Sequence, residues 1–168
     1  MNPAYRGSII FGVVLIVIGV IFLAFALVPG LSLNLSWPVI FYVLAAAFAV
    51  PYFVWPEAKK GLAALFIPAS IFLSLGLIFT YTVLSEDWVA WAYAWLLIVS
   101  GVGLGLALAS TLGEWGKTVM WVGIWMLGIS IGLFGLFATL FGAPLLKTLG
   151  SVMVILVGIM LLLHAFRK

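Results

Sequence analysis

Few side chains in this sequence could carry out chemistry, and their types narrow the possibilities. The 168 residues include four Asp or Glu, one His and no Cys. Without cysteine there is no disulfide, no thiolate nucleophile and no sulfur ligand for a metal. The sequence also contains no Ser-His-Asp set, no H-E-x-x-H motif and no phosphate-binding loop. We therefore expect no catalytic residue, no metal site and no cofactor.

The single imidazole, His164, has two interpretations. It stands one turn from the end of an apolar run, beside Arg167 and Lys168. An interfacial histidine at such a place reaches lipid headgroups or the last carbonyls of its helix, which is the simpler interpretation. The alternative is an axial ligand of a pigment or a pH-sensing group. One histidine cannot build a zinc site, which takes several protein ligands.

Tryptophan is the other residue type that could form a binding site, since the chain has eight. Four of them stand at the ends of apolar runs, as anchors at the lipid–water interface do: Trp37, Trp55, Trp88 and Trp115. The remaining four form two pairs with a spacing of four residues, Trp91 with Trp95 and Trp121 with Trp125, so each pair shares a helical face. These pairs are candidates for lining a lipophilic pocket, although packing between helices is the commoner reason for such a stripe.

The elements that must position these residues are membrane-spanning helices. Hydrophobic residues make up 67% of the chain and charged residues 7%, and the mean hydropathy is +1.43, so a soluble domain could not be covered with polar surface. A helix needs roughly 20 apolar residues to cross a bilayer core of about 30 Å. Uncharged runs of that order predict six helices, at residues 8–28, 37–55, 61–84, 88–110, 119–141 and 148–166.

A short motif returns along the chain at nearly constant spacing. The residues IGVIF at 18–22 return as LGLIF at 75–79 and, more loosely, as IGLF at 131–134, which aligns Gly19, Gly76 and Gly132. The chain then divides into hairpin repeats at about 6–57, 58–114 and 115–168. Hairpins with an even number of spans share one orientation, so the repeats should be parallel. We expect an all-α membrane protein, a single transmembrane domain over 1–168 with three hairpins in a pseudo-threefold, six-helix bundle.

Small residues indicate where these helices approach one another. G-x-x-x-G steps join Gly101 to Gly105 and Gly128 to Gly132. Such steps allow two helix backbones to come close in a membrane. Together with Gly19 and Gly76, these positions are predicted to pack helices within the chain, and self-association through the same faces is the alternative.

The charged residues predict the orientation of the chain. One set of loops and ends carries six of the seven cations, Arg6, Lys59, Lys60, Lys117, Arg167 and Lys168, and the other set has only Lys147. The positive-inside rule then places both termini in the cytoplasm. No Asp, Glu, Lys or Arg lies inside a predicted span, which argues against a transporter driven by protons or sodium ions.

The repeated unit resembles a bacterial helical hairpin. It consists of Arg6-Gly7, then GVVLIVIGVIFL at residues 12–23 and WPVI at residues 37–40. This pattern is similar to the paired helices of LiaF-type envelope-stress regulators and of small multi-pass proteins of the HdeD type. The resemblance implies a multi-pass protein of the bacterial inner membrane and supplies no functional residues.

Two functions follow from these observations. The first is a non-enzymatic membrane protein that acts through helix contacts, as an accessory or scaffold subunit or as an envelope-stress factor. Its partners would be the lipid bilayer, other membrane subunits or further copies of itself, and not nucleic acid, because seven dispersed cations do not form a basic patch. The alternative is a carrier or binder of a neutral or lipophilic small molecule such as a lipid, quinone or pigment.

Overall fold

The computed structural model describes Gly12, Gly19 and residues 37–166, without the side chains of residues 160, 161, 164 and 165. Every element in the described part of the chain is helical. The α-helices are α3 (Val39–Val54), α4 (Lys59–Leu62), α5 (Phe66–Ser85), α6 (Trp91–Ala94), α7 (Leu96–Gly113), α8 (Lys117–Phe141) and α9 (Pro144–Phe166). Short 3-10 segments join them: η1 (Pro56–Ala58), η2 (Ala63–Leu65) and η3 (Trp88–Ala90). The predicted span at 8–28 lies outside the described residues, apart from Gly12 and Gly19.

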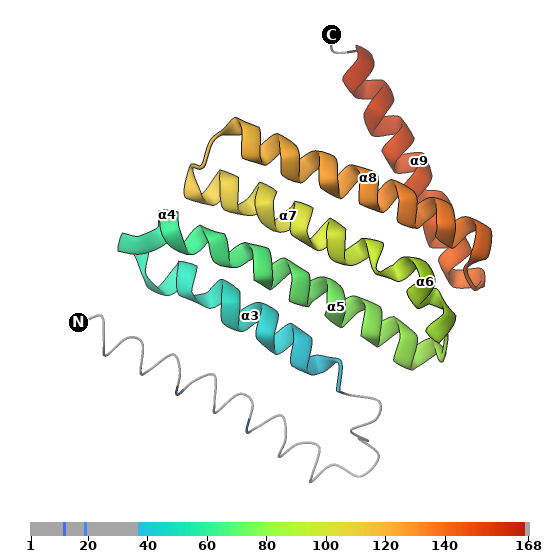
Figure 1. The fold of residues 1–168 in the computed structure, drawn as a ribbon, viewed down its shortest axis with the longest axis horizontal. Coiled ribbons are helices and arrows are strands. Elements are labelled where there is room, and N and C mark those ends of the chain that lie inside the picture. The colour runs from blue at the N-terminus through green and yellow to red at the C-terminus, as the bar shows by residue number, and fades with distance from the viewer. Residues whose placement is uncertain (1–11, 13–18, 20–36, 167–168) are drawn as a thin grey trace.

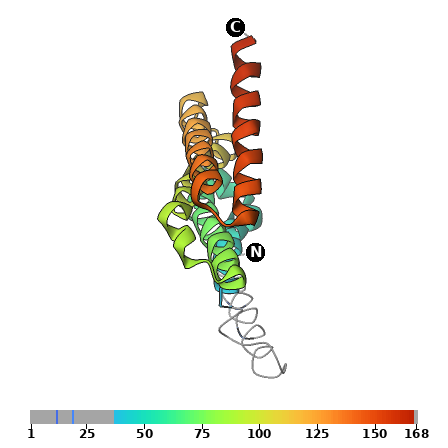
Figure 2. The ribbon, with the colours of Figure 1, turned by 90° about the vertical axis from the view of Figure 1, so that its right-hand side faces the viewer.

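The long helices lie side by side in the order of the sequence. Helix α3 packs on α5, α5 on α7, α7 on α8, and α8 on α9, with the most extensive interface between α7 and α8. Figure 1 shows α3, α5, α7 and α8 as one row, and the edge-on view of Figure 2 shows α9 leaving that row on one side. Within the described residues, α3 and α9 are the first and last helices of this series.

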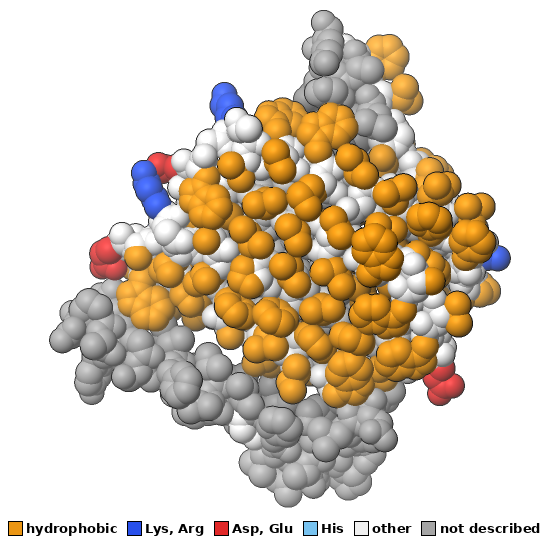
Figure 3. Space-filling model, viewed as in Figure 1, with side chains coloured by type: hydrophobic (Ala, Val, Ile, Leu, Met, Phe, Trp, Pro, Cys, Tyr) orange, Lys and Arg blue, Asp and Glu red, His pale blue; other side chains and the backbone are white. Residues whose placement is uncertain are grey.

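The lengths and composition of these helices suit a membrane. Three described stretches are long and apolar enough to cross one: Pro56–Ser85, Leu96–Gly113 and Lys117–Phe141. Two further stretches, Val39–Val54 of α3 and Pro144–Ile159 of α9, are similarly apolar but shorter than a full membrane span. Figure 3 shows hydrophobic side chains over the middle of the molecule and charged side chains at the two ends of the helices. This is the distribution expected when the row stands across a bilayer.

The helix boundaries differ from the predicted ones at two prolines and at Trp95. Pro56 opens η1 and Pro144 opens α9, because proline lacks only an N–H that the first turn leaves unpaired in any case. Both helical stretches therefore begin several residues before the predicted starts at 61 and 148. The predicted span at 88–110 is instead interrupted at Trp95, where η3 and α6 give way to α7.

Candidate functional site

Helix α7 contacts α5 through two of the predicted glycines. A Cβ added at Gly101 would lie 2.8 Å from the Ser70 carbonyl oxygen, and one at Gly105 would lie 2.8 Å from the Phe66 carbonyl oxygen. Real Cβ atoms do not approach backbone so closely, so these positions tolerate only glycine unless the helices move apart. The G-x-x-x-G step at 101–105 thus lies at a backbone-to-backbone contact.

The opposite face of α7 contacts α8 through a second pair of glycines. A Cβ at Gly103 would be 2.7 Å from the Gly123 carbonyl oxygen, and a Cβ at Gly123 would be 2.6 Å from the Gly103 carbonyl oxygen. Gly135 and Gly150 form a similar reciprocal contact between α8 and α9, at 2.9 and 2.6 Å. Gly103 and Gly135 stand beside the predicted G-x-x-x-G steps, whereas Gly123 and Gly150 lie outside them.

The sequence holds a signal for Gly103 but not for its partner. A step of two residues turns a helix by about 200°, so Gly103 must face away from the side that Gly101 and Gly105 share. Gly123 has Leu127 four residues later and lies in no G-x-x-x-G step. A search for that motif could not find it, because its small partner is on another helix.

The remaining predicted glycines have looser surroundings. A Cβ at Gly76 would meet the Tyr42 ring of α3 at 3.0 Å, whereas one at Gly132 would meet only Val157 of α9, at 3.7 Å. Gly128 is partly buried, and Gly19 is helical and exposed, with no described atom within 4 Å of an added Cβ. The motif-aligned glycines of the second and third units therefore face different kinds of neighbour.

The two tryptophan pairs are not part of one site. The Trp91 ring packs on Phe79 of α5 with ring centroids 5.1 Å apart, and the Trp95 indole N–H donates to the Ala92 carbonyl oxygen at 3.2 Å. Trp121 and Trp125 instead line a groove along α8. The side chain of His164, on α9, lies outside the described residues.

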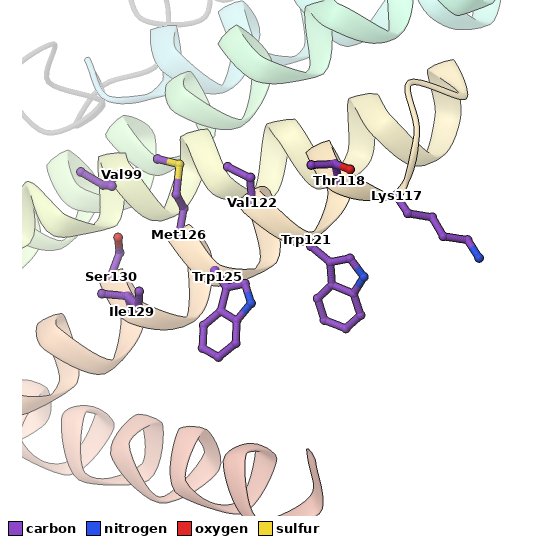
Figure 4. Close-up of a pocket in the computed structure, with 9 residues that line it drawn as sticks. All are labelled: Val99, Lys117, Thr118, Trp121, Val122, Trp125, Met126, Ile129 and Ser130. Atoms are coloured by element: carbon purple, nitrogen blue, oxygen red, sulfur yellow. The ribbon is translucent and has the colours of Figure 1, made fainter. Parts of the chain in front are cut away.

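The groove on α8 is large enough to hold a ligand. Its volume is about 620 Å³, which falls within the range of roughly 300–1000 Å³ of small-molecule sites. Figure 4 shows both indole rings pointing away from α7, on the side of α8 where α9 lies. The lining residues are Val99 of α7 and, on α8, Lys117, Thr118, Trp121, Val122, Trp125, Met126, Ile129 and Ser130.

The groove has a graded chemistry along the helix. Lys117, the first residue of α8, is its one charged lining residue, and the Thr118 hydroxyl is beside it. The walls between are apolar and aromatic, and Ser130, which is buried, lies near the far end. From Lys117 to Ser130 the helix rises about 20 Å at 1.5 Å per residue. The site can therefore hold an elongated apolar molecule with a polar group at one end.

The lysines at the helix ends near Lys117 differ in the partners that they contact. The Lys60 ammonium lies 2.5 Å from the Glu114 carboxylate, and the Trp115 indole N–H donates to the Lys60 carbonyl oxygen at 3.2 Å. The Lys59 ammonium lies over the Tyr52 ring, 5.4 Å from its centroid. Lys117 is exposed and takes part in no ion pair among the described residues.

Several buried hydroxyls in the described helices bond to nearby backbone. Ser100 donates to the Leu96 carbonyl oxygen at 3.1 Å and Thr82 to the Phe79 carbonyl oxygen at 3.1 Å. Ser70 donates to the carbonyl oxygens of Phe66 and Ile67. The described residues contain no cluster of His, Cys, Asp and Glu that could hold a metal. Each of these hydroxyls bonds to a carbonyl oxygen of its own helix.

Comparisons of the chain with protein-family models, with curated proteins and with solved structures give no match. The function therefore has to be argued from the groove, the helix contacts and the charges of the chain itself.

Proposed function

We propose that this chain is a non-enzymatic, multi-pass membrane protein that acts through helix contacts, as an accessory or scaffold subunit or an envelope-stress factor. The observation that supports this proposal is the open row of helices. Helix α8 is the longest described α-helix, yet only 22% of an 18-residue apolar stretch within it is buried. A scaffold needs such unburied helix surface, and close packing between membrane helices does not require catalytic groups.

The finer architecture belongs to the same proposal. We propose six spans in three hairpin repeats, with both termini in the cytoplasm of a bacterial inner membrane. The recurring motif supports the repeats, and the cations that gather at one set of helix ends support the orientation. The likeness of the repeat to LiaF-type and HdeD-type hairpins supports the bacterial assignment. A cysteine-labelling scan of the loops would test it: residues 86 and 87 should react from the outside, and residues 57 and 114 only after permeabilisation.

Native mass spectrometry of protein extracted gently from its own membrane tests the scaffold role. The expected result is a stoichiometric complex with another membrane subunit or with further copies of this chain. A bare monomer under conditions that preserve known complexes of the same membrane would overturn the proposal.

A second candidate function has its own supporting observation. The groove on α8 favours a binder of a lipophilic small molecule, the alternative that the tryptophan spacing suggested. This candidate predicts a copurifying small molecule after native extraction, and extraction that yields none would count against it.

A further inference from the structure

We infer that the α8 groove binds one acyl chain of an anionic phospholipid, with the phosphate at Lys117. This inference rests on the second candidate function and names the class of ligand. The first argument is the shape of the site. The groove follows α8 for about 20 Å, which equals one leaflet of a bilayer with its headgroup layer.

The polarity of the groove gives the direction of the lipid. Lys117 and Thr118 stand at the helix end that meets the membrane surface, and Trp121, Trp125 and Ile129 follow toward the bilayer interior. A phospholipid has the same sequence of groups, a charged phosphate and then hydrocarbon. Trp121 lies one turn below Lys117, at the depth where aromatic side chains gather beneath the headgroups of a membrane.

Charge complementarity selects an anionic headgroup over a zwitterionic one. Of the three lysines at this end of the described chain, Lys60 pairs with Glu114 and Lys59 lies over the Tyr52 ring. Lys117 lines the groove, and no described carboxylate does. A phosphatidylglycerol phosphate would give Lys117 a counterion, whereas phosphatidylcholine brings its own cation. The orientation proposed above also places this end in the leaflet richer in anionic lipid.

The test uses the whole chain in a neutral detergent, titrated with dioleoyl phosphatidylglycerol or with dioleoyl phosphatidylcholine and measured by native mass spectrometry. Wild type should retain phosphatidylglycerol in preference to phosphatidylcholine. Lys117→Gln should lower the retention of phosphatidylglycerol about fivefold, the effect of one cation at an anionic surface, and leave phosphatidylcholine unchanged. Lys147→Gln is the matched control, because it removes one positive charge at the opposite ends of the helices, far from the groove. It should change the retention of neither lipid.

A second variant separates the inference from the function on which it rests. Val122→Trp adds bulk to the groove wall at a half-exposed position and should lower the retention of both lipids. If Val122→Trp has that effect and Lys117→Gln has none, the groove binds lipophilic molecules without reading the headgroup, and the inference is overturned while the second candidate stands. If neither variant changes retention of either lipid, both are overturned.

Discussion

The two sides of helix α8 are both apolar, but one packs against α7 and the other lines the groove. Toward α7, Gly123 brings the two backbones into contact, since its added Cβ would lie 2.6 Å from the Gly103 carbonyl oxygen. On the other side, Trp125 and Ile129 are 50% and 57% exposed and line the groove. Lipid is as apolar as these side chains, so hydrophobicity alone does not decide which side packs. The size of the side chain decides it.

Adding a side chain at the packed side should lower the free energy of unfolding the most. Gly123→Ala places a methyl group against the α7 backbone, which cannot yield as a flexible side chain would. We expect the free energy of unfolding to fall by about 1–3 kcal/mol, the usual range for overpacking. Unfolding in mixed micelles with increasing sodium dodecyl sulfate measures it.

The matched control is Gly158→Ala on α9, where no described atom lies within 4 Å of an added Cβ. Alanine is the better helix former by about 1 kcal/mol, so this variant should be neutral or slightly more stable. Equal losses in the two variants would contradict the prediction, because helix propensity favours alanine at both positions and only the contact at Gly123 distinguishes them.

The crossing of α8 and α9 should respond less, because α9 lies at the edge of the row. A Cβ at Gly150 would lie 2.6 Å from the Gly135 carbonyl oxygen, and we expect Gly150→Ala to cost about 1–2 kcal/mol in the same unfolding assay. Gly132→Ala is the comparison, since the nearest atom, of Val157, lies at an ordinary 3.7 Å. A loss for Gly132→Ala as large as for Gly150→Ala would mean that α9 stays close to α8 beyond the crossing.

The groove side should tolerate truncation. Trp125→Ala removes a half-exposed ring, and we expect the free energy of unfolding to change by no more than about 0.5 kcal/mol, as for other surface positions. The same variant should weaken lipid retention. A loss of stability comparable to that of Gly123→Ala, with lipid retention intact, would assign Trp125 to helix packing, which was the simpler interpretation of its spacing.

Sequence reasoning reached the class of the molecule and part of the packing. Run length and composition predicted apolar helices, because the bilayer fixes the length that a spanning helix needs. The G-x-x-x-G rule identified Gly101 and Gly105, whose shared face is encoded within one helix. It did not identify Gly123 and Gly150, because the contact of each is defined by a glycine on another helix. Contacts between helices depend on which helices become neighbours, and local spacing does not contain that information.

The residues of the groove were also only partly predictable from the sequence. The spacing of Trp121 and Trp125 predicted a shared face, and the structure places both rings in the groove. Trp91 instead packs on Phe79 of α5 and does not line the groove, which agrees with packing between helices as the commoner reason for such a stripe. Lys117 was read from the sequence only as an orientation signal. Its place at the end of the groove depends on α8 beginning at this residue.

The smallest effect is expected for the ion pair between Lys60 of α4 and Glu114, the residue that follows α7. Both side chains are mostly exposed, at 74% and 69%, so water and salt screen their attraction. Glu114→Gln should change the free energy of unfolding by about 0–0.5 kcal/mol, and less at high ionic strength. If it instead approached the cost of Gly123→Ala, electrostatics at the membrane surface would hold the row together. A negligible effect would indicate that the backbone contacts of Gly101 and Gly105 with α5 hold α7 in place, because they lie along the apolar part of the helices, where no water competes.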